Sequence, residues 1–171
     1  MNTRNKSIGI IAGIAILVLI GLVWFARPAP GEKNTAAAGT GGGDAGAITA
    51  DEHAFDFGTI SMAAGTVRHA FPVKNGGDAA IAIKKMYTSC MCTTASLTAG
   101  GTTYGPFGMP GHGAIPAINA NIPAGETASV EVVFDPAAHG PAGVGKIERI
   151  VRLERERGEP LELHVSAFVT P

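Results

Sequence analysis

Both cysteines of the chain lie in one short motif, Thr88-Ser89-Cys90-Met91-Cys92-Thr93-Thr94. Residues two positions apart on an extended backbone point to the same side. We therefore expect Cys90 and Cys92 to present two sulfurs on one face, with Met91 on the other. Soft-ligand or thiol chemistry is expected at this motif, because the rest of the chain has no other cysteine.

Several roles are open to the two cysteines. Both could be small apolar side chains near a sheet edge. A Cys90–Cys92 disulfide would close a very small ring, which predicts strain and easy reduction and would suit a redox-active pair. No thioredoxin-like βαβ pattern supports that role. The stretch after Lys85 also has no Lys or Arg before residue 126, so we expect no nearby cation to activate the thiols.

Metal binding is the remaining role, and Cu(I) is the ion that two thiolates would suit best. Met109 or His112 is the predicted third ligand, and Met86 is also a candidate. No Asp or Glu lies between Asp78 and Glu126, which disfavours a harder ion. Zinc would need more nitrogen or sulfur ligands, which His112, His139 or another histidine would have to supply.

The predicted third ligands lie in a long stretch, 98–125, that is rich in glycine and proline. A loop of 28 residues inside a compact domain is uncommon and is usually functional or disordered. We expect it to act as a lid that becomes ordered when the metal binds.

The elements that position the motif are predicted to be strands. Apolar and polar residues alternate with period two in six segments, and turn residues separate them: 54–57, 67–74, 81–88, 129–134, 147–153 and 161–169. The chain is therefore predicted to form an all-β, Ig-like antiparallel β-sandwich of about seven strands. Arg149 falls in phase with the apolar residues of its strand, which indicates a bulge or a half-exposed face there.

The N-terminal part of the chain is predicted to be a membrane anchor. Residues 1–7 are basic, and residues 8–26 are nineteen residues without a charge, which as a helix span roughly 28 Å. Residues 27–50 read as a flexible Gly/Ala/Pro linker, and 51–171 as the sandwich domain.

The anchor is expected to be uncleaved, with a cleaved signal peptide as the alternative, because Trp24 to Pro28 offers no clean cleavage site. Arg4 and Lys6 place the N-terminus in the cytoplasm, so we expect a single-pass cell-membrane protein whose C-terminal domain is extracytoplasmic.

Charge and motifs argue against several functions. Residues 51–171 contain nine Lys or Arg and twelve Asp or Glu without a basic stripe, so nucleic acid is not an expected partner. Residues 140–146 match the start of a phosphate loop, but Ile147 stands where a hydroxyl is needed, so nucleotide binding is not expected. No acid–base pair or nucleophile motif is recognisable, and we expect no enzymatic activity.

The order and spacing of five motifs resemble a bacterial family, domain of unknown function 1573: Phe55-Asp56-Phe57-Gly58-Thr59-Ile60, Phe71-Pro72-Val73-Lys74-Asn75-Gly76-Gly77, Ser89-Cys90-Met91-Cys92-Thr93, Ile122-Pro123-Ala124-Gly125 and Phe134-Asp135-Pro136. The resemblance covers about 53–169. It implies an Ig-like domain of the major-sperm-protein and hydin type, whose kin are chiefly adhesion or assembly modules. Two features depart from the family: Met91 stands where it usually has glycine, and 98–121 is longer than its usual loop.

The sequence thus predicts a membrane-anchored, extracytoplasmic, non-enzymatic binding or assembly module whose partner is another envelope protein. The alternative function is Cu(I) binding or thiol redox chemistry at Cys90 and Cys92. In the copper model, Met109 and His112 complete the site.

Overall fold

The computed structural model describes residues 48–111 and 115–171. The expected basic N-terminus 1–7, the expected anchor 8–26, most of the expected linker 27–50, and His112 lie outside these residues. Within the described ranges, no helix has the length and apolar character needed to cross a bilayer.

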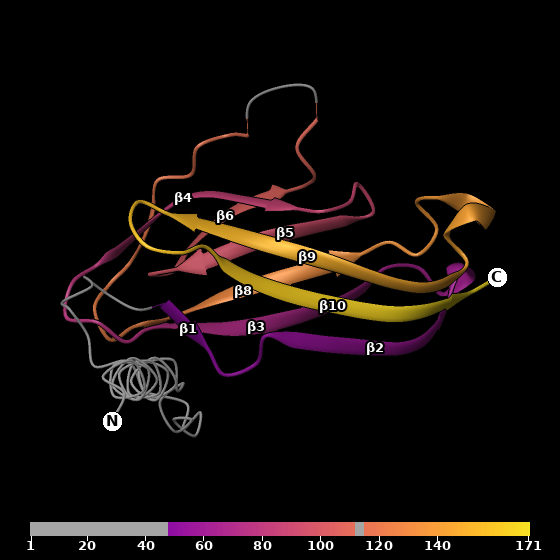
Figure 1. Ribbon diagram of the computed structural model, residues 1–171, viewed down its shortest axis with the longest axis horizontal. Helices are drawn as coiled ribbons and strands as arrows, with labels where there is room; N and C mark the ends of the chain where they lie inside the picture. The colour runs from indigo at the N-terminus through magenta and orange to yellow at the C-terminus, as the bar shows by residue number, and fades with distance from the viewer. Residues whose placement is uncertain (1–47, 112–114) are drawn as a thin grey trace, which may run out of the picture. The chain divides into compact units, whose positions relative to one another are not determined.

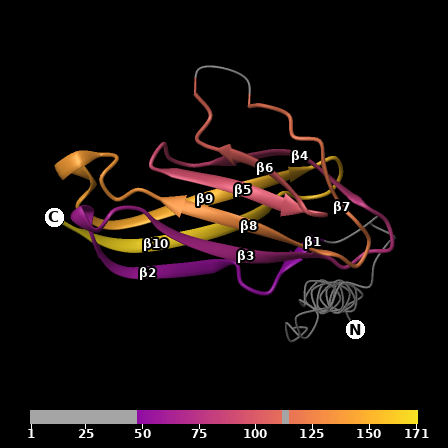
Figure 2. The same cartoon turned by 180° about the vertical axis from the view of Figure 1, so that it is seen from behind.

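The described residues form two five-stranded β-sheets, one stacked on the other (Figure 1). The first sheet has the order β1-β3-β8-β5-β6, and each neighbouring pair in it is antiparallel. It is the nearer layer in Figure 2. Its strands are β1 (Ile48–Ala50), β3 (Val67–Asn75), β8 (Thr127–Phe134), β5 (Thr93–Ala99) and β6 (Thr102–Phe107).

The second sheet has the order β2-β10-β9-β4-β7. The β2–β10 pair is parallel, and the other pairs are antiparallel. Two short 3-10 turns, η1 (Met62–Ala64) and η2 (Gly140–Gly143), join strands. The strands of this sheet are β2 (Ala54–Ser61), β10 (Leu161–Thr170), β9 (Gly145–Arg155), β4 (Ile81–Thr88) and β7 (Ala120–Ile122).

The predicted all-β sandwich is confirmed, but two details of the prediction were wrong. The described residues contain ten strands rather than about seven, and the β2–β10 pair is parallel. Two of the additional strands, β1 and β7, have three residues each, which is too short to show a readable alternation. β1 also lies inside the stretch expected to be linker, so the sheet begins three residues before the expected domain boundary at 51.

The period-two pattern places one face of each long strand between the sheets. Burying these apolar faces is the main favourable term in folding. The largest side chains in this core are completely buried, and they come from both sheets: Phe71, Ile83, Met86, Leu97, Ile122, Leu153 and Leu163.

Much of the expected long loop 98–125 is sheet. β5 and β6 form a hairpin in which Ala99 pairs with Thr102. The two residues between them, Gly100 and Gly101, have φ values of 55° and 79°. A two-residue turn with positive φ at both positions matches the twist of the flanking strands, and glycine adopts it without steric cost. Among the described residues of 98–125, those outside the strands and the hairpin turn are therefore 108–111, 115–119 and 123–125.

Candidate thiol–disulfide site

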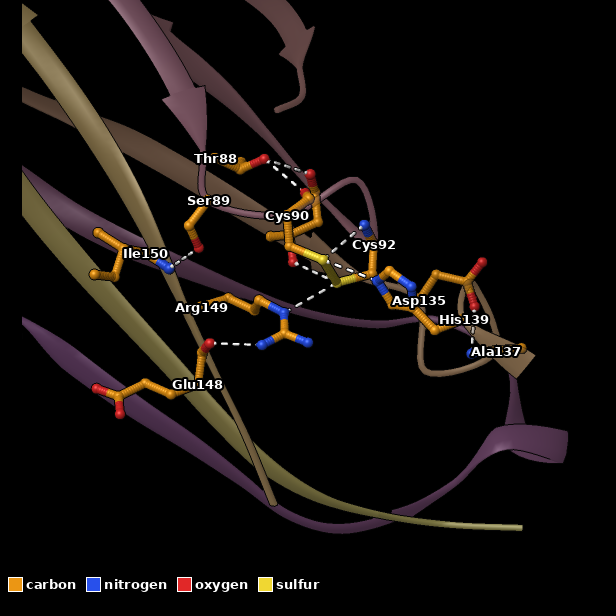
Figure 3. Close-up of a disulfide and its surroundings, with 11 residues drawn as sticks. Thr88, Ser89, Cys90, Cys92, Asp135, Ala137, His139, Glu148, Arg149 and Ile150 are labelled. Carbon is orange, nitrogen blue, oxygen red and sulfur yellow. Dashed lines mark hydrogen bonds between the residues drawn. A yellow bond between two sulfur atoms is a disulfide. The ribbon is translucent and has the colours of Figure 1, made fainter. Parts of the chain in front are cut away.

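The cysteine motif forms a tight turn that carries the chain from β4 in one sheet to β5 in the other (Figure 3). The amide of Thr93 donates a hydrogen bond to the carbonyl of Cys90 at 3.1 Å, which closes the turn. The buried hydroxyl of Thr88 lies 2.9 Å from the Cys90 carbonyl and 2.8 Å from that of Thr93. The expectation of an extended backbone was wrong here, because the chain must change sheets at this point.

The turn brings the two sulfurs together, and Cys90 and Cys92 form a disulfide. Cys92 is buried, with 3% of its surface exposed, in a small apolar cluster at this end of the sandwich. Cys90 is partly buried at the edge of the same cluster, and Met91 between them is 65% exposed. Of the two cysteine residues, Cys90 is therefore the more exposed.

Hydrogen bonds to both sheets hold the turn in place. Ser89 donates its amide to the carbonyl of Ile150 in β9 at 2.9 Å, and its hydroxyl accepts the Ile150 amide at the same distance. On the other side, the amide of Asp135 donates to the Cys92 carbonyl at 2.8 Å. The turn is thus fixed to β9 and to the end of β8, which limits how far the sulfurs can move.

A cationic side chain points at the buried sulfur. The Nε–H of Arg149 donates to Cys92 Sγ at 3.1 Å (Figure 3). Its Nη1 also donates to the carbonyl of Glu148 at 2.8 Å, which fixes the guanidinium. The expectation that no cation lies near the thiols was wrong, because strand pairing brings Arg149 from β9, 57 residues away in sequence.

A histidine lies beside the outer sulfur. His139 Nε2 is 3.1 Å from Cys90 Sγ. His139 immediately precedes η2, in a turn where Asp135 accepts the Ala137 amide at 2.9 Å. The amide of Cys92 also donates to Cys90 Sγ, at 3.3 Å. Each sulfur therefore has its own polar neighbours.

These neighbours are arranged to stabilise negative charge on sulfur. A hydrogen bond to a charged acceptor is about twice as strong as one between neutral groups. A disulfide sulfur is neutral, whereas a thiolate is anionic, so Arg149 and the Cys92 amide interact more strongly with the reduced pair than with the disulfide. The site can thus favour reduction and can bind a soft cation once it is reduced.

The sequence indicated Arg149 without assigning it a role. Arg149 is a charged residue at a position where the alternation of its strand predicts an apolar one, and the structure shows why an arginine stands there. β9 pairs with β10 without a register shift from Gly145 to Leu153, so no bulge turns Arg149 outward there. Its half-buried side chain reaches the cysteines instead. A charged residue at a core-facing position is the signal that could have identified it.

The structure does not place the other predicted ligands at the cysteines. Met109 is 46% exposed beyond β6, in a hollow of about 260 Å³ that neither cysteine lines. Met86 lines the same hollow from the core. His112 lies outside the described residues. His139, named in sequence only as a possible zinc ligand, is the histidine that contacts Cys90.

A family match confirms the resemblance seen in the sequence for the first part of the domain, which carries three of the five motifs. Residues 48–105 match the family described as "Protein of unknown function (DUF1573)". That region includes the whole Cys90–Cys92 turn. No curated protein sequence matches the chain significantly.

Solved structures resemble the chain in fold. A protein of unknown function from Porphyromonas gingivalis W83 is 14% identical, with a TM-score of 0.54; the match covers 79% of this chain and 51% of that one. This chain thus spans about half the length of that protein. The PapD-like domain 7 of human CEP192 is 13% identical, with a TM-score of 0.41, and the match covers 72% and 84% of the two chains. The periplasmic chaperone SfaE is 4% identical, with a TM-score of 0.39 and coverage of 73% and 59%. Likeness at these identities concerns the fold alone.

Proposed function

We propose that this chain, whose residues 48–105 belong to the DUF1573 family, is a membrane-anchored, extracytoplasmic Ig-like binding module that carries a redox-active disulfide. Its partner is another envelope protein with a reactive pair of thiols. The disulfide exchanges with that pair, and no hydrolase or transferase activity is part of the proposal.

The observation that supports this function best is the placement of Arg149 against the buried sulfur. A purely structural disulfide has no need of a guanidinium within 3.1 Å of one sulfur and an imidazole within 3.1 Å of the other. Both groups stabilise the thiolates that exist only during and after reduction. The nearby cation makes Cys92 the better leaving group, and leaving-group stability speeds exchange.

The exchange begins at Cys90, the more exposed of the two cysteine residues. A thiolate of the partner attacks Cys90 Sγ, forming a mixed disulfide and releasing Cys92 as a thiolate beside Arg149. The second partner thiol loses its proton and attacks the partner's own sulfur in the mixed disulfide, and Cys90 leaves as a thiolate. The partner loses two electrons and its two thiol protons to form its own disulfide. The Cys90–Cys92 pair gains the two electrons, and the two protons pass to the released thiolates or to water. His139 lies where it can pass a proton to Cys90.

The proposed location rests on two independent features. Residues 8–26 have the length and apolar character of a membrane-spanning helix, and Arg4 and Lys6 before them favour a cytoplasmic N-terminus. Disulfides persist in oxidising compartments outside the cytoplasm. A disulfide in the C-terminal domain agrees with the topology that those charges predict.

Mapping the first step of exchange tests the redox function. The oxidised full-length chain, in detergent micelles, is incubated with reduced glutathione, quenched with acid and mapped by mass spectrometry. We expect glutathione on Cys90 and a free thiol at Cys92. No reaction with glutathione at either cysteine would contradict the proposal, and so would a mixed disulfide formed mainly at Cys92.

Single-cysteine variants provide the matched control. Each reduced variant is incubated with glutathione disulfide, so that its one thiol must attack. In Cys92→Ser the thiol of Cys90 is expected to react quickly, whereas in Cys90→Ser the buried Cys92 should react more slowly. Equal rates would show that access does not distinguish the two sulfurs.

The topology is tested separately. Protease added to spheroplasts is expected to digest 51–171, and a cytoplasmic marker protein should stay intact. Protection of this segment in spheroplasts, with digestion after lysis, would place it in the cytoplasm and contradict the proposed location.

A further inference from the structure

The geometry points to a Cu(I) site in the reduced protein, formed by Cys90, Cys92 and His139. Their ligand atoms all lie within 4.8 Å of one another. The inference rests on the proposed function, since only the reduced pair can bind an ion. It differs from the sequence-based model in its third ligand, which comes from the turn before η2 rather than from 109–112.

The type of ion follows from the ligand atoms. Two thiolates and one imidazole form a soft set, which suits Cu(I) and disfavours hard cations such as Mg²⁺ or Ca²⁺. The cluster contains no carboxylate. The nearest acidic residue along the turn, Asp135, is already hydrogen-bonded to the amide of Ala137. Zinc ordinarily takes four ligands, and the described residues bring only these three together.

Charge balance also favours this ion. Cu(I) with two thiolates has a net charge of −1. Arg149, which is 3.1 Å from Cys92 Sγ, compensates this charge at a buried sulfur whose other recorded side-chain polar neighbour among the described residues is the Thr93 hydroxyl at 3.6 Å. Partners that orient and polarise a metal ligand without binding the ion commonly affect affinity strongly. Arg149 is therefore a positioning residue of the site.

The location of the cluster allows an ion to enter. His139 is exposed and Cys90 is partly exposed, whereas Cys92 forms the buried floor. An ion can thus approach from the solvent side of the turn and meet the imidazole and the outer sulfur first. Binding Cu(I) releases the two thiol protons and blocks the disulfide, so that copper and oxidation compete for the same sulfurs.

A competition titration tests the inference. The full-length chain in detergent micelles is reduced with excess dithiothreitol, freed of it without oxygen, and titrated with Cu(I) against a colorimetric Cu(I) chelator. We expect one Cu(I) per chain. Replacing His139→Ala is expected to weaken binding by at least about tenfold, the lower end of the loss seen when even a second-shell partner is removed. X-ray absorption is expected to detect two sulfurs and one nitrogen around the copper, and the nitrogen should be lost in His139→Ala.

Two variants serve as matched controls. His53→Ala removes another exposed histidine, and Met109→Ala removes the third ligand of the sequence-based model. Neither is expected to change the affinity. A site unaffected by His139→Ala, a loss of binding in Met109→Ala, or replacement of Cu(I) by an equal amount of Zn²⁺ would overturn the inference.

The inference and the proposed function can fail separately. If the chain exchanges with glutathione at Cys90 but binds Cu(I) no more tightly than its Cys92→Ser variant does, the copper site is contradicted and the redox function stands. If the chain does not react with glutathione but binds Cu(I) after chemical reduction, the redox function is contradicted and the copper site stands.

Discussion

The two ends of the sandwich differ in the groups that contact their buried polar and sulfur atoms. At the end where β3 finishes and β8 begins, Asn75 is fully buried and every one of its recorded partners is backbone. Its Nδ2 donates to the carbonyls of Ala79, Ile122 and Pro123 at 2.8–3.1 Å, and its Oδ1 accepts the amide of Gly77 at 3.0 Å. Asn75 thus joins the β3–β4 connection to the end of β7 and the β7–β8 connection.

At the opposite end, where β4 finishes and β5 begins, hydrogen bonds of the backbone and of two hydroxyls hold the chain of the cysteine turn, and one backbone amide, that of Cys92, also donates to Cys90 Sγ. The sulfurs themselves face side chains, Arg149 and His139, that come from other elements. A neutral disulfide needs no such partners. The comparison shows that the Asn75 end is arranged for stability and that the cysteine end has groups suited to a change of charge.

The largest expected effect is a loss of stability at the Asn75 end. Asn75→Ala leaves buried backbone groups without a partner, and this is expected to lower the free energy of unfolding by about 3 kcal/mol. Denaturant unfolding of the full-length chain measures it. The exposed Asn121→Ala is the control, with a change within about 0.5 kcal/mol. Equal effects would show that the Asn75 network does not stabilise the fold.

Reducing the disulfide is expected to lower the free energy of unfolding by less than Asn75→Ala does. A cross-link between residues two apart constrains the unfolded chain weakly, and chain-entropy arguments give about 1.5 kcal/mol. Unfolding curves of the oxidised and the reduced wild-type chain measure the difference. A loss larger than that of Asn75→Ala would mean that the disulfide is chiefly a structural cross-link, and the contrast between the two ends would disappear.

The smallest expected effect concerns Met91, where the family usually has glycine. No described residue other than glycine has a positive φ, so Met91 occupies ordinary backbone space. Met91→Gly is expected to destabilise the chain by about 0.5–1 kcal/mol through the greater freedom of glycine in the unfolded chain. Met91→Ala, the control for the lost side chain, should be nearly neutral because the side chain is exposed. A stabilising Met91→Gly would indicate that methionine strains the turn.

The fold was predictable where strands are long. The alternation in 161–169 appears as β10, and that in 67–74 as β3, because one face of each is buried. The β5–β6 hairpin was missed although Gly100-Gly101 is a strong turn signal, since the surrounding glycines and prolines suggested a loop. Short strands such as β7 depend on their neighbours rather than on their own sequence.

The site was predictable only in part. Adjacency in sequence identified Cys90 and Cys92, but not the groups that face them. His139 and Arg149 reach the cysteines through the end of β8 and the pairing of β9, at sequence separations of 49 and 57 residues. Nearest charges along the chain therefore gave the wrong electrostatic environment, because a sandwich brings residues together across its sheets.

The reduction potential tests most directly whether the cysteine end is a redox centre. The full-length chain is equilibrated with glutathione buffers, and its thiols are trapped and counted. Structural disulfides have potentials below about −300 mV. We predict a potential above that value for the wild type. Arg149→Met should lower it by about 30 mV, equivalent to a tenfold change in the equilibrium, because the Cys92 thiolate loses its cation.

Arg68→Met is the matched control, since Arg68 lies on the exposed face of β3 and pairs with Glu131 at 3.7 Å. Arg68→Met is expected to leave the reduction potential unchanged. The reduction potential of Arg149→Lys should lie between those of Arg149→Met and the wild type, because lysine keeps the positive charge. A wild-type potential below about −300 mV, or one that Arg149→Met does not shift, would contradict a redox role for the Cys90–Cys92 pair.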